Sequence, residues 1–585
     1  MMKTMKYYLK NIFLAASCLW LFTACNDFLT LYPEDDIVDD EYWETGEDVQ
    51  SVVASCYRFM LEDNVISRII YWGEARSDNM DYSTSASTDE QYLKDANLLS
   101  SNGLVTWGDF YKVINICNKV IKSAPAVRDR DANFTEERLH NYLAEVYTLR
   151  ALCYFYLVRS FGDVPYVTEP SESEQQDYQV AQSSADDVIV PALIEDLKLA
   201  EEYAPEEWPT EQYTRGRITK NGVRALLADV YLWKASDAGN SEAQADYRSC
   251  VEACDRVLYN QAMYETEMMM VEGNRMYNSV FYTGNSTEAI FELNFDKDGK
   301  MNGATANLYG NTTKGKSAHF EPTAQLFNTY LDVQYDYRAR DFIAATVEAG
   351  SDGSVVPPTS FKVFKYEGQS PALALVPHTS DEYSYRASTS TANWIFYRLS
   401  DIYLMKAEAL AELAVTDDER KTVISLCNVT YKRATMEMDS LEYADYPSMD
   451  AVKAMVLQER QRELCLEGHR WFDLRRYSVR EKYPVTLTAD AALLLANMKD
   501  AQLAPLEAAA EDAGVDPTVF YTTRTLAEAF LEKCDRERIE SFAPLFEGSG
   551  NAAQAARAAL LPNTFLQALV CRALTGPILP EVIEE

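Results

Sequence analysis

The chain has 585 residues, a formal net charge of −37 at pH 7 and only four histidines. An acidic surface of this kind repels phosphate backbones and anionic head groups, which argues against nucleic-acid binding and favours a neutral ligand or a large protein partner. So few histidines supply a zinc cluster poorly, and we expect neither a metal nor a cofactor.

Residues 1–24 have the features of a secretory signal peptide. Lys3, Lys6 and Lys10 precede an apolar stretch that is too short to span a membrane. The small residues before Cys25 match a bacterial lipobox, so we predict that Cys25 carries lipid and anchors an otherwise soluble mature chain. An ordinary signal peptide followed by an incidental cysteine is the alternative. Cleavage would leave 51 basic and 91 acidic residues, a net charge near −40.

The cysteines form no recognisable framework. Of the 11 cysteines, Cys18 would leave with the signal peptide and Cys25 would be acylated. The others are scattered without CxxC pairs, although Cys250 and Cys254 lie one helical turn apart. We therefore expect small buried residues rather than disulfides or a zinc site.

A nine-residue pattern occurs three times, beginning at Leu143, Leu227 and Leu399, with spacings of 84 and 172 residues. Positions one, four, five and nine are Leu, Val or Ile, Tyr, and Ala in every copy. These positions share one helix face, with a small residue where a neighbouring helix comes close. The pattern predicts a mostly α-helical fold of stacked, tetratricopeptide-like helical hairpins.

Three long stretches between the helices have a different composition, rich in Ser, Asp, Asn, Gly and Tyr. They cover about residues 71–106, 296–320 and 346–392, and we expect long ordered loops that carry a binding site. Two short segments, 288–295 and 361–366, alternate apolar and polar residues and are predicted to be strands.

Seven further motifs follow one another along the chain. They are the lipobox with Asn26-Asp27-Phe28-Leu29, Pro33 and Tyr42-Trp43; Trp107, Phe110, Tyr111, Ile114 and Asn118; LRALCYFYLVRSFGDVPYV at 149–167; Arg217 to Lys220; EAIFEL at 288–293; YRLSDIYLMKAEAL at 397–410; and QERQRELCLEGHRWFDLRR at 458–476. In this order they resemble the SusD/RagB outer-membrane lipoproteins of Bacteroidetes.

The resemblance covers about residues 20–480 and implies a SusD-like helical scaffold on the cell surface, tethered to the outer membrane by lipid. It also implies a partner, a TonB-dependent SusC-like transporter, to which glycans, or peptides in some branches, are passed without chemistry. The segment 481–585 does not share the resemblance. Its Ala- and Leu-rich composition predicts a divergent helical region whose role the sequence leaves open.

The stretch ELCLEGHRWFDLRR at 463–476 holds several charges that could be catalytic or structural. Glu459, Arg460, Glu463 and Glu467 recur at spacings of three and four, so we expect them on one helix face, which Gly468 would end in a left-handed conformation. A catalytic carboxylate pair needs two different environments and an open cleft. We interpret the stretch as a structural ion-pair network.

Other catalytic or metal-binding signals are weak. The chain contains no GxSxG, Walker or HExxH motif. Asn294, Asp296, Asp298 and Gly299 match the first half of a calcium loop, but Thr305 stands where a bidentate Glu is required. A turn at the end of a strand is the simpler interpretation.

Sugars present flat C–H faces and rings of hydroxyls, so their sites combine exposed aromatic rings with Asp, Asn or Arg. Three clusters in the predicted loops offer this chemistry. The candidate ligand-binding residues are Trp72, Arg76, Asp78, Asn79 and Tyr82; Asn302, Asn307, Tyr309 and Asn311; and Tyr383, Tyr385, Arg386 and Trp394. In the family, the Arg-x-Asp stretch that corresponds to Arg76 and Asp78 precedes a loop of the ligand site. The alternative is that these side chains pack in the core or, for Asp78, cap a turn.

These observations predict a non-catalytic glycan-binding lipoprotein of the cell surface. A peptide-binding protein of the same type is one alternative. A surface glycoside hydrolase is a second, and it would need two carboxyl groups ~5 or ~6.5–9.5 Å apart across a groove. A structural surface protein that binds neither glycan nor peptide is a third.

Overall fold

The computed structural model describes residues 42–95, 101–171, 180–237, 239–263, 270–310, 318–331, 336–345, 348–349, 355–356, 358, 360–368, 385–386 and 390–480. The predicted signal peptide, Cys25 and the segment 481–585 lie outside these residues.

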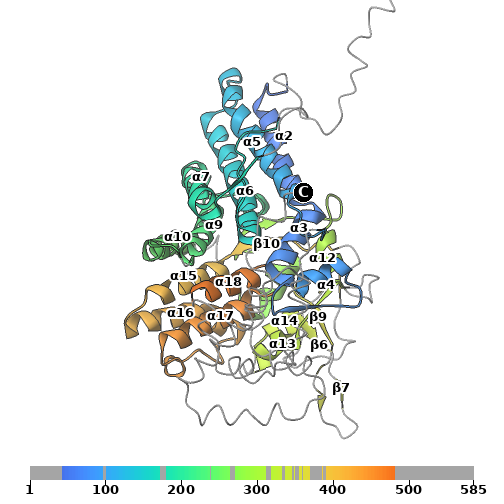
Figure 1. Cartoon of the computed structure of the whole chain (residues 1–585), viewed down its shortest axis with the longest axis vertical. Helices are drawn as coiled ribbons and strands as arrows, with labels where there is room; N and C mark the ends of the chain where they lie inside the picture. The colour runs from blue at the N-terminus through green and yellow to red at the C-terminus, as the bar shows by residue number, and fades with distance from the viewer. Residues whose placement is uncertain are drawn as a thin grey trace, which may run out of the picture.

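The body of the protein is a stack of antiparallel helices (Figure 1). In chain order its long helices are α2 (Gly46–Met60), α5 (Gly108–Arg130), α6 (Glu136–Phe161), α7 (Val190–Tyr203), α9 (Lys220–Ala235), α10 (Ala243–Met263), α15 (Leu399–Leu413), α16 (Asp417–Ala434), α17 (Met449–Leu464) and α18 (Arg470–Arg480). Each helix from α5 to α16 packs mainly on its neighbours along the stack, with α2 against α5, and α17 against α15 and α16. The predicted hairpin scaffold is confirmed.

The three copies of the nine-residue pattern lie in α6, α9 and α15. In the first copy Leu143, Val146 and Ala151 are buried, and Tyr147 is half-buried beside them. The other two copies repeat this burial at every matching position. The three helices therefore share the pattern because each lies between two others and buries the same set of positions.

Shorter elements are grouped beside the stack and between its helices. The helices are α3 (Asp63–Ile70), η1 (Tyr71–Ala75), α4 (Thr88–Lys94), η2 (Ala185–Ile189), α8 (Glu211–Gly216), α11 (Gly273–Met276), η3 (Tyr277–Thr283), α12 (Gly303–Leu308), α13 (Ala324–Leu331), α14 (Arg338–Phe342) and η6 (Tyr443–Asp445). Five antiparallel strand pairs accompany them: β1 (Met80–Tyr82) with β5 (Phe320–Pro322), β2 (Val164–Pro165) with β3 (Gln182–Ser183), β4 (Ala289–Leu293) with β10 (Trp394–Arg398), β6 (Ile343–Ala345) with β9 (Phe361–Val363), and β7 (Glu348–Ala349) with β8 (Val355–Val356).

The two predicted strands are β4 and β9, and β4 lies deeper than its alternating sequence suggests. All five of its residues are buried, as are all five of β10. Glu288 and Glu292 are therefore in the interior, where hydrogen bonds to Arg398 and Asn393 respectively stabilise them.

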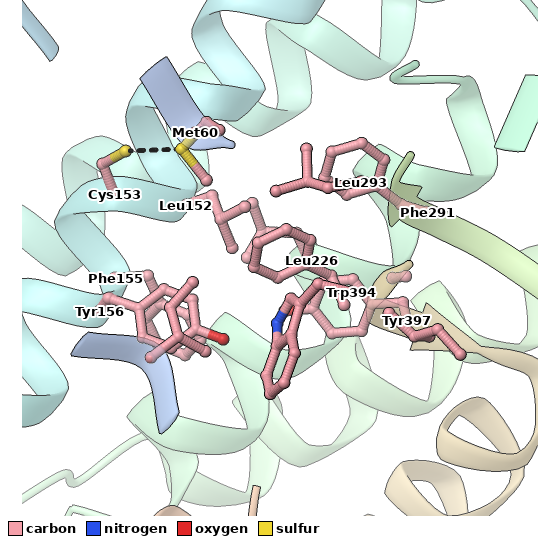
Figure 2. Close-up of a cluster of buried hydrophobic side chains, with 14 of the residues drawn as sticks. Met60, Leu152, Cys153, Phe155, Tyr156, Leu226, Phe291, Leu293, Trp394 and Tyr397 are labelled. Carbon is pink, nitrogen blue, oxygen red and sulfur yellow. Dashed lines mark hydrogen bonds between the residues drawn. The ribbon is translucent and has the colours of Figure 1, made fainter. Parts of the chain in front are cut away.

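One large hydrophobic core joins the stack to these shorter elements. Figure 2 shows side chains from α2, α6, α9, β4 and β10 meeting there, among them Met60, Leu226, Phe291 and Trp394. The seven cysteines in the described part of the chain are free and buried, as expected. No helix among the described residues is long and apolar enough to cross a membrane.

Candidate ligand-binding region and the buried ion-pair hub

The centre of the region is the turn that joins α17 to α18, residues 465–468. Leu466 and Gly468 both have positive φ, 69° and 84°. The η1 helix approaches this turn so closely that a Cβ atom on Gly73 would overlap the Gly468 carbonyl oxygen. The predicted left-handed glycine is confirmed at Gly468, but the helix ends earlier, at Leu464, so Glu467 lies in the turn.

Glu463 is fully buried and binds three arginines from distant parts of the chain. Its Oε1 lies 2.6 Å from Arg398 Nη1 and also accepts a hydrogen bond from Arg433, and its Oε2 lies 3.1 Å from Arg338 Nη1. Burial alone would favour the neutral acid, but the three guanidinium groups outweigh it and hold the pKa of Glu463 well below its usual value.

Two further groups of buried ion pairs lie in the same elements, Arg460 and Arg476 with their acids and Arg470 with Asp78, and we call all these charges together the ion-pair hub. Glu467 accepts hydrogen bonds from Lys365 Nζ and Arg398 Nη2, 2.6 and 2.7 Å away, and these cations overcome burial to lower its pKa to about 2. The cations of the hub are Arg338, Lys365, Arg398, Arg433, Arg460, Arg470 and Arg476, and its acids are Asp78, Glu288, Asp336, Asp401, Glu408, Glu459, Glu463, Glu467 and Asp473. All of them are buried.

The ion pairs of the hub show whether the charges of the stretch 463–476 are catalytic or structural. Its acids Glu463, Glu467 and Asp473 are each bound by at least two cations, so none of these three carboxylates is free to act as a base. The structural interpretation is confirmed. The charges hold α17, α18, β10 and α14 together.

The first predicted cluster lies against the 465–468 turn. Trp72 is 2% exposed, donates a hydrogen bond to the Leu104 carbonyl oxygen at 3.1 Å, and stacks on Phe110. Asp78 pairs with Arg470 of the hub, with Oδ1 2.8 Å from its Nε. These two side chains are structural, because neither has a surface left for a ligand.

Asn79, Tyr82 and Arg76 complete this cluster. Asn79 is fully buried and donates to Glu74 Oε1 at 2.8 Å. Tyr82, on β1, is half-buried, and the half-buried guanidinium of Arg76 lies 4.2 Å from the ring centre of Trp471. Of the first cluster, Arg76 and Tyr82 alone keep a substantial exposed surface.

The second cluster also lies in the interior. Asn302 is the N-cap of α12 and donates to the Ala392 carbonyl oxygen at 3.0 Å. Tyr309 is 1% exposed, and its hydroxyl donates to the Leu466 carbonyl oxygen at 3.3 Å. The Asn307 carbonyl oxygen accepts from the His319 backbone N–H, and Asn311 lies outside the described residues.

The third cluster joins the second through stacked rings. Trp394 is fully buried and stacks on Tyr366, which stacks in turn on Tyr309. Tyr385 packs edge-on against Phe364, and the Arg386 guanidinium donates to the Phe281 carbonyl oxygen at 2.8 Å. Tyr383 lies outside the described residues.

Most described residues of the three clusters therefore lie in the interior, and only Tyr309 and Trp394 among their aromatic rings contact the 465–468 turn. The expectation of exposed platforms is wrong for Trp72, Tyr309, Tyr385 and Trp394. The physical reason is that these rings pack on other parts of the interior: Tyr309 and Trp394 meet the turn, Trp72 packs on Phe110, and Tyr385 packs on Phe364. An aromatic ring buried on both faces cannot stack on a sugar.

Glu74 is a central residue of this region that the sequence analysis missed. Its carboxylate accepts hydrogen bonds from the Leu466 and Gly468 backbone N–H groups at 2.7 and 3.1 Å and so fixes η1 to the turn. Burial raises the pKa of Glu74 to about 7, and burial raises those of Glu292 and Glu367 to about 7 as well. The two glycines that flank this contact, Gly73 and Gly468, were its one signal in the sequence.

The partial calcium motif forms a turn. Asp296 Oδ1 accepts hydrogen bonds from the backbone N–H groups of Asp298 and Gly299, and the Asp296 N–H donates to the Lys300 carbonyl oxygen at 3.0 Å. Asn294 donates to the Gln212 carbonyl oxygen instead of pointing at an ion. The turn interpretation is confirmed.

Comparison with known proteins gives two family matches. Residues 27–232 match the family described as "Starch-binding associating with outer membrane", and residues 374–513 match the SusD family. Among curated relatives, SusD-like protein P38 of Formosa agariphila is 27% identical over 508 residues, covering 80% of this chain and 91% of the relative. A SusD-like protein of Bacteroides ovatus is 22% identical over 480 residues, covering 80% and 83%.

Solved structures show the same fold. Bacteroides fragilis NanU superimposes with a TM-score of 0.60 at 22% identity, over 76% of this chain and 92% of that one. A SusD superfamily protein from Bacteroides vulgatus has a TM-score of 0.57 at 21% identity, over 74% and 89%.

The long helices form one stack, and the buried ion pairs of the hub hold its last helices to β10 and α14. The chain belongs to the SusD/RagB family, whose members are non-catalytic binding proteins associated with the outer membrane. The glycoside hydrolase alternative is therefore excluded.

Proposed function

We propose that this protein captures neutral oligosaccharides at the cell surface and delivers them to a SusC-like, TonB-dependent transporter of the outer membrane. A lipid on Cys25 would hold it there. Family membership supports the binding role and the membrane association, and the name of the matched family points to starch-like glycans as the first ligands to test.

The charge distribution supports a neutral ligand. The hub combines seven cations with nine acids and is nearly neutral, so almost all of the net charge of −37 lies outside it. The cations of the hub are buried and cannot meet a polyanion. The remaining acidic surface would repel sulfated or uronic glycans, whereas it leaves the binding of an uncharged sugar unaffected.

Arg76 and Tyr82 are the proposed ligand contacts among the described residues. Both are half-buried, and both lie on the segment that Glu74 fixes to the 465–468 turn and Asp78 fixes to Arg470 of α18. The stack of Arg76 on Trp471 presents planar groups beside hydrogen-bond donors, which is the chemistry that a sugar needs. Tyr383 is proposed as a further contact.

The test combines binding with turnover. A panel of neutral glycans, starting with maltoheptaose, would be screened for a rise in the melting temperature, and each glycan that binds would be incubated with the protein and analysed for products. We expect binding without cleavage. Stabilisation by peptides alone would favour the peptide-binding alternative, and released sugars would contradict a binding protein.

The site is tested by a matched pair of variants. Tyr82→Ala should weaken binding of the stabilising glycan, whereas Tyr259→Ala, which removes a 64% exposed tyrosine of α10, should not. Equal binding by both variants would contradict the assignment of Tyr82.

A further inference from the structure

An open hollow of about 580 Å³ lies along α16, between this helix and the return segment 437–443. Its volume lies within the range of small-molecule sites, ~300–1,000 Å³. Figure 1 places α16 on the opposite side of the helical body from α4, on which β1 with Tyr82 packs. Arg76 lies against Trp471 of α18, and none of these residues lines the hollow. The hollow is therefore separate from the region described above.

The return segment is fixed to α16, so the hollow is formed before any ligand arrives. The Asn428 side chain donates to the Leu441 carbonyl oxygen at 3.0 Å and accepts from the Leu441 N–H at 2.8 Å. At the other end, the Arg420 guanidinium donates to the Tyr443 hydroxyl and the Pro447 carbonyl oxygen. A preformed site loses little conformational entropy on binding.

The lining combines an apolar floor with an aromatic wall. Ile424 and Leu441 are buried, and the half-buried Tyr443, whose ring carries the Arg420 guanidinium 4.4 Å from its centre, forms one side. Ser425 contributes an exposed hydroxyl from the helix. These groups suit a ligand with an apolar face and polar edges, as a sugar ring has.

The charges that line the hollow cancel. Lys421 and Lys432 line it from α16, and Glu437 and Glu442 line it from the return segment. The Lys421 ammonium also pairs with Asp418 of the same helix at 3.0 Å. Two ammonium donors opposite two carboxylate acceptors favour neither a cation nor an anion. They can hydrogen-bond to the hydroxyls of an uncharged sugar, which both donate and accept.

We propose that this hollow is a second, accessory binding site for neutral saccharides, which increases retention of a polymer held at the first site. The inference rests on the proposed function for the class of ligand. Because the two sites are separate, the accessory site adds most to the binding of long chains that reach both, and little to that of short oligosaccharides.

The experiment uses the full chain and measures retention in native gels that contain soluble starch, xylan, mannan or mixed-linkage β-glucan. S425W fills the hollow, and K432A removes one ammonium donor with little change of shape. For the polymer that retains the wild type, both variants should weaken retention, by about three- to tenfold for S425W. T422W is the control, because Thr422 is exposed on the same helix but does not line the hollow.

The outcomes separate this inference from the proposed function. If no neutral polymer retains the wild type, both are contradicted. If a polymer retains the wild type, S425W and K432A equally, the accessory site is wrong and the proposed function stands. If S425W and T422W weaken retention equally, the retention of K432A is compared with that of the wild type. Equal retention of K432A and the wild type overturns the accessory site. Competition by trialanine but not by glycans would overturn the saccharide as its ligand.

Discussion

Arg398 and Glu463 join the end of β10 to the last turn of α17 in the protein interior. Arg398 Nη1 lies 2.6 Å from Glu463 Oε1, and Arg398 Nη2 also donates to the Glu463 carbonyl oxygen at 2.9 Å. The two residues are 65 positions apart and both are buried. Arg398 therefore binds both the side chain and the backbone of Glu463, which fixes the start of the 465–468 turn.

Glu463→Ala should lower the free energy of unfolding by about 3 kcal/mol or more, because it leaves three buried arginines short of a partner. Urea unfolding followed by circular dichroism would measure the change. Glu47→Ala is the matched control, since the Glu47 to Arg138 pair is largely exposed and should contribute less than about 1 kcal/mol. Equal stability of both variants would show that the hub does not hold the fold together.

Gly73→Ala should be strongly destabilising, because the added methyl group overlaps the Gly468 carbonyl oxygen. The backbone on both sides is held by Glu74, so it cannot easily move away. Gly108→Ala places a methyl group where no atom lies within 4 Å and should be tolerated. Melting temperatures of the two variants compare them directly, and a Gly73→Ala protein as stable as Gly108→Ala would refute the close approach.

The hub and the repeats were the features that the sequence predicted best. Both depend on the spacing of residues that are close in the sequence, such as the Leu, Val and Ala positions of α6 or the acids of α17. Such a spacing can be recognised in the sequence alone. The partners of Glu463 could not be predicted in the same way. Arg338, Arg398 and Arg433 come from three separate segments, and no spacing links them to it.

The exposure of the candidate site residues was predicted poorly for a related reason. A tryptophan or tyrosine in a polar segment has the same sequence signature whether it packs inside or faces solvent. Trp72 is buried through contacts with Leu104 and Phe110, and Tyr309 through Leu466. These contacts depend on the tertiary fold, which composition does not reveal.

Stability should fall as the pH rises from about 5.5 to 8. The carboxyls of Glu74, Glu292 and Glu367 have pKa values near 4.5 when unperturbed and about 7 in the fold, so the folded state binds more protons between these values. Their contribution is full below pH 4.5 and is lost as the pH rises through 7. Each carboxyl should account for about 2 kcal/mol between pH 5.5 and 8.

Melting curves at half-unit pH intervals would measure this dependence. Glu367→Gln removes one titrating group and should reduce the slope by about a third, if the three groups contribute equally. Glu467, whose pKa is lowered to about 2, acts in the other direction, but its contribution is lost only as the pH falls from about 4.5 through 2. A melting temperature that rises from pH 5.5 to 8 would contradict the assignment.

Cys25→Ser should release the protein from the outer membrane, because the acyl chains that the lipobox predicts can no longer be attached. Fractionation of cells that produce the wild type or the variant, followed by immunoblotting, would show the difference. Cys56→Ser serves as the control, since Cys56 is buried in the fold and should not affect the membrane association. Retention of both variants in the outer membrane would exclude a lipid anchor at Cys25.

The central claim is that the protein binds a neutral glycan at a site formed by stacking and hydrogen bonds. Calorimetry with the stabilising neutral glycan, and with sulfated and uronic glycans of similar length, at about 50 and 500 mM NaCl tests it most directly. We predict a Kd for the neutral glycan in the range of roughly 1 μM to 1 mM, nearly unchanged by salt. Tight, salt-sensitive binding to the acidic glycans alone would contradict it.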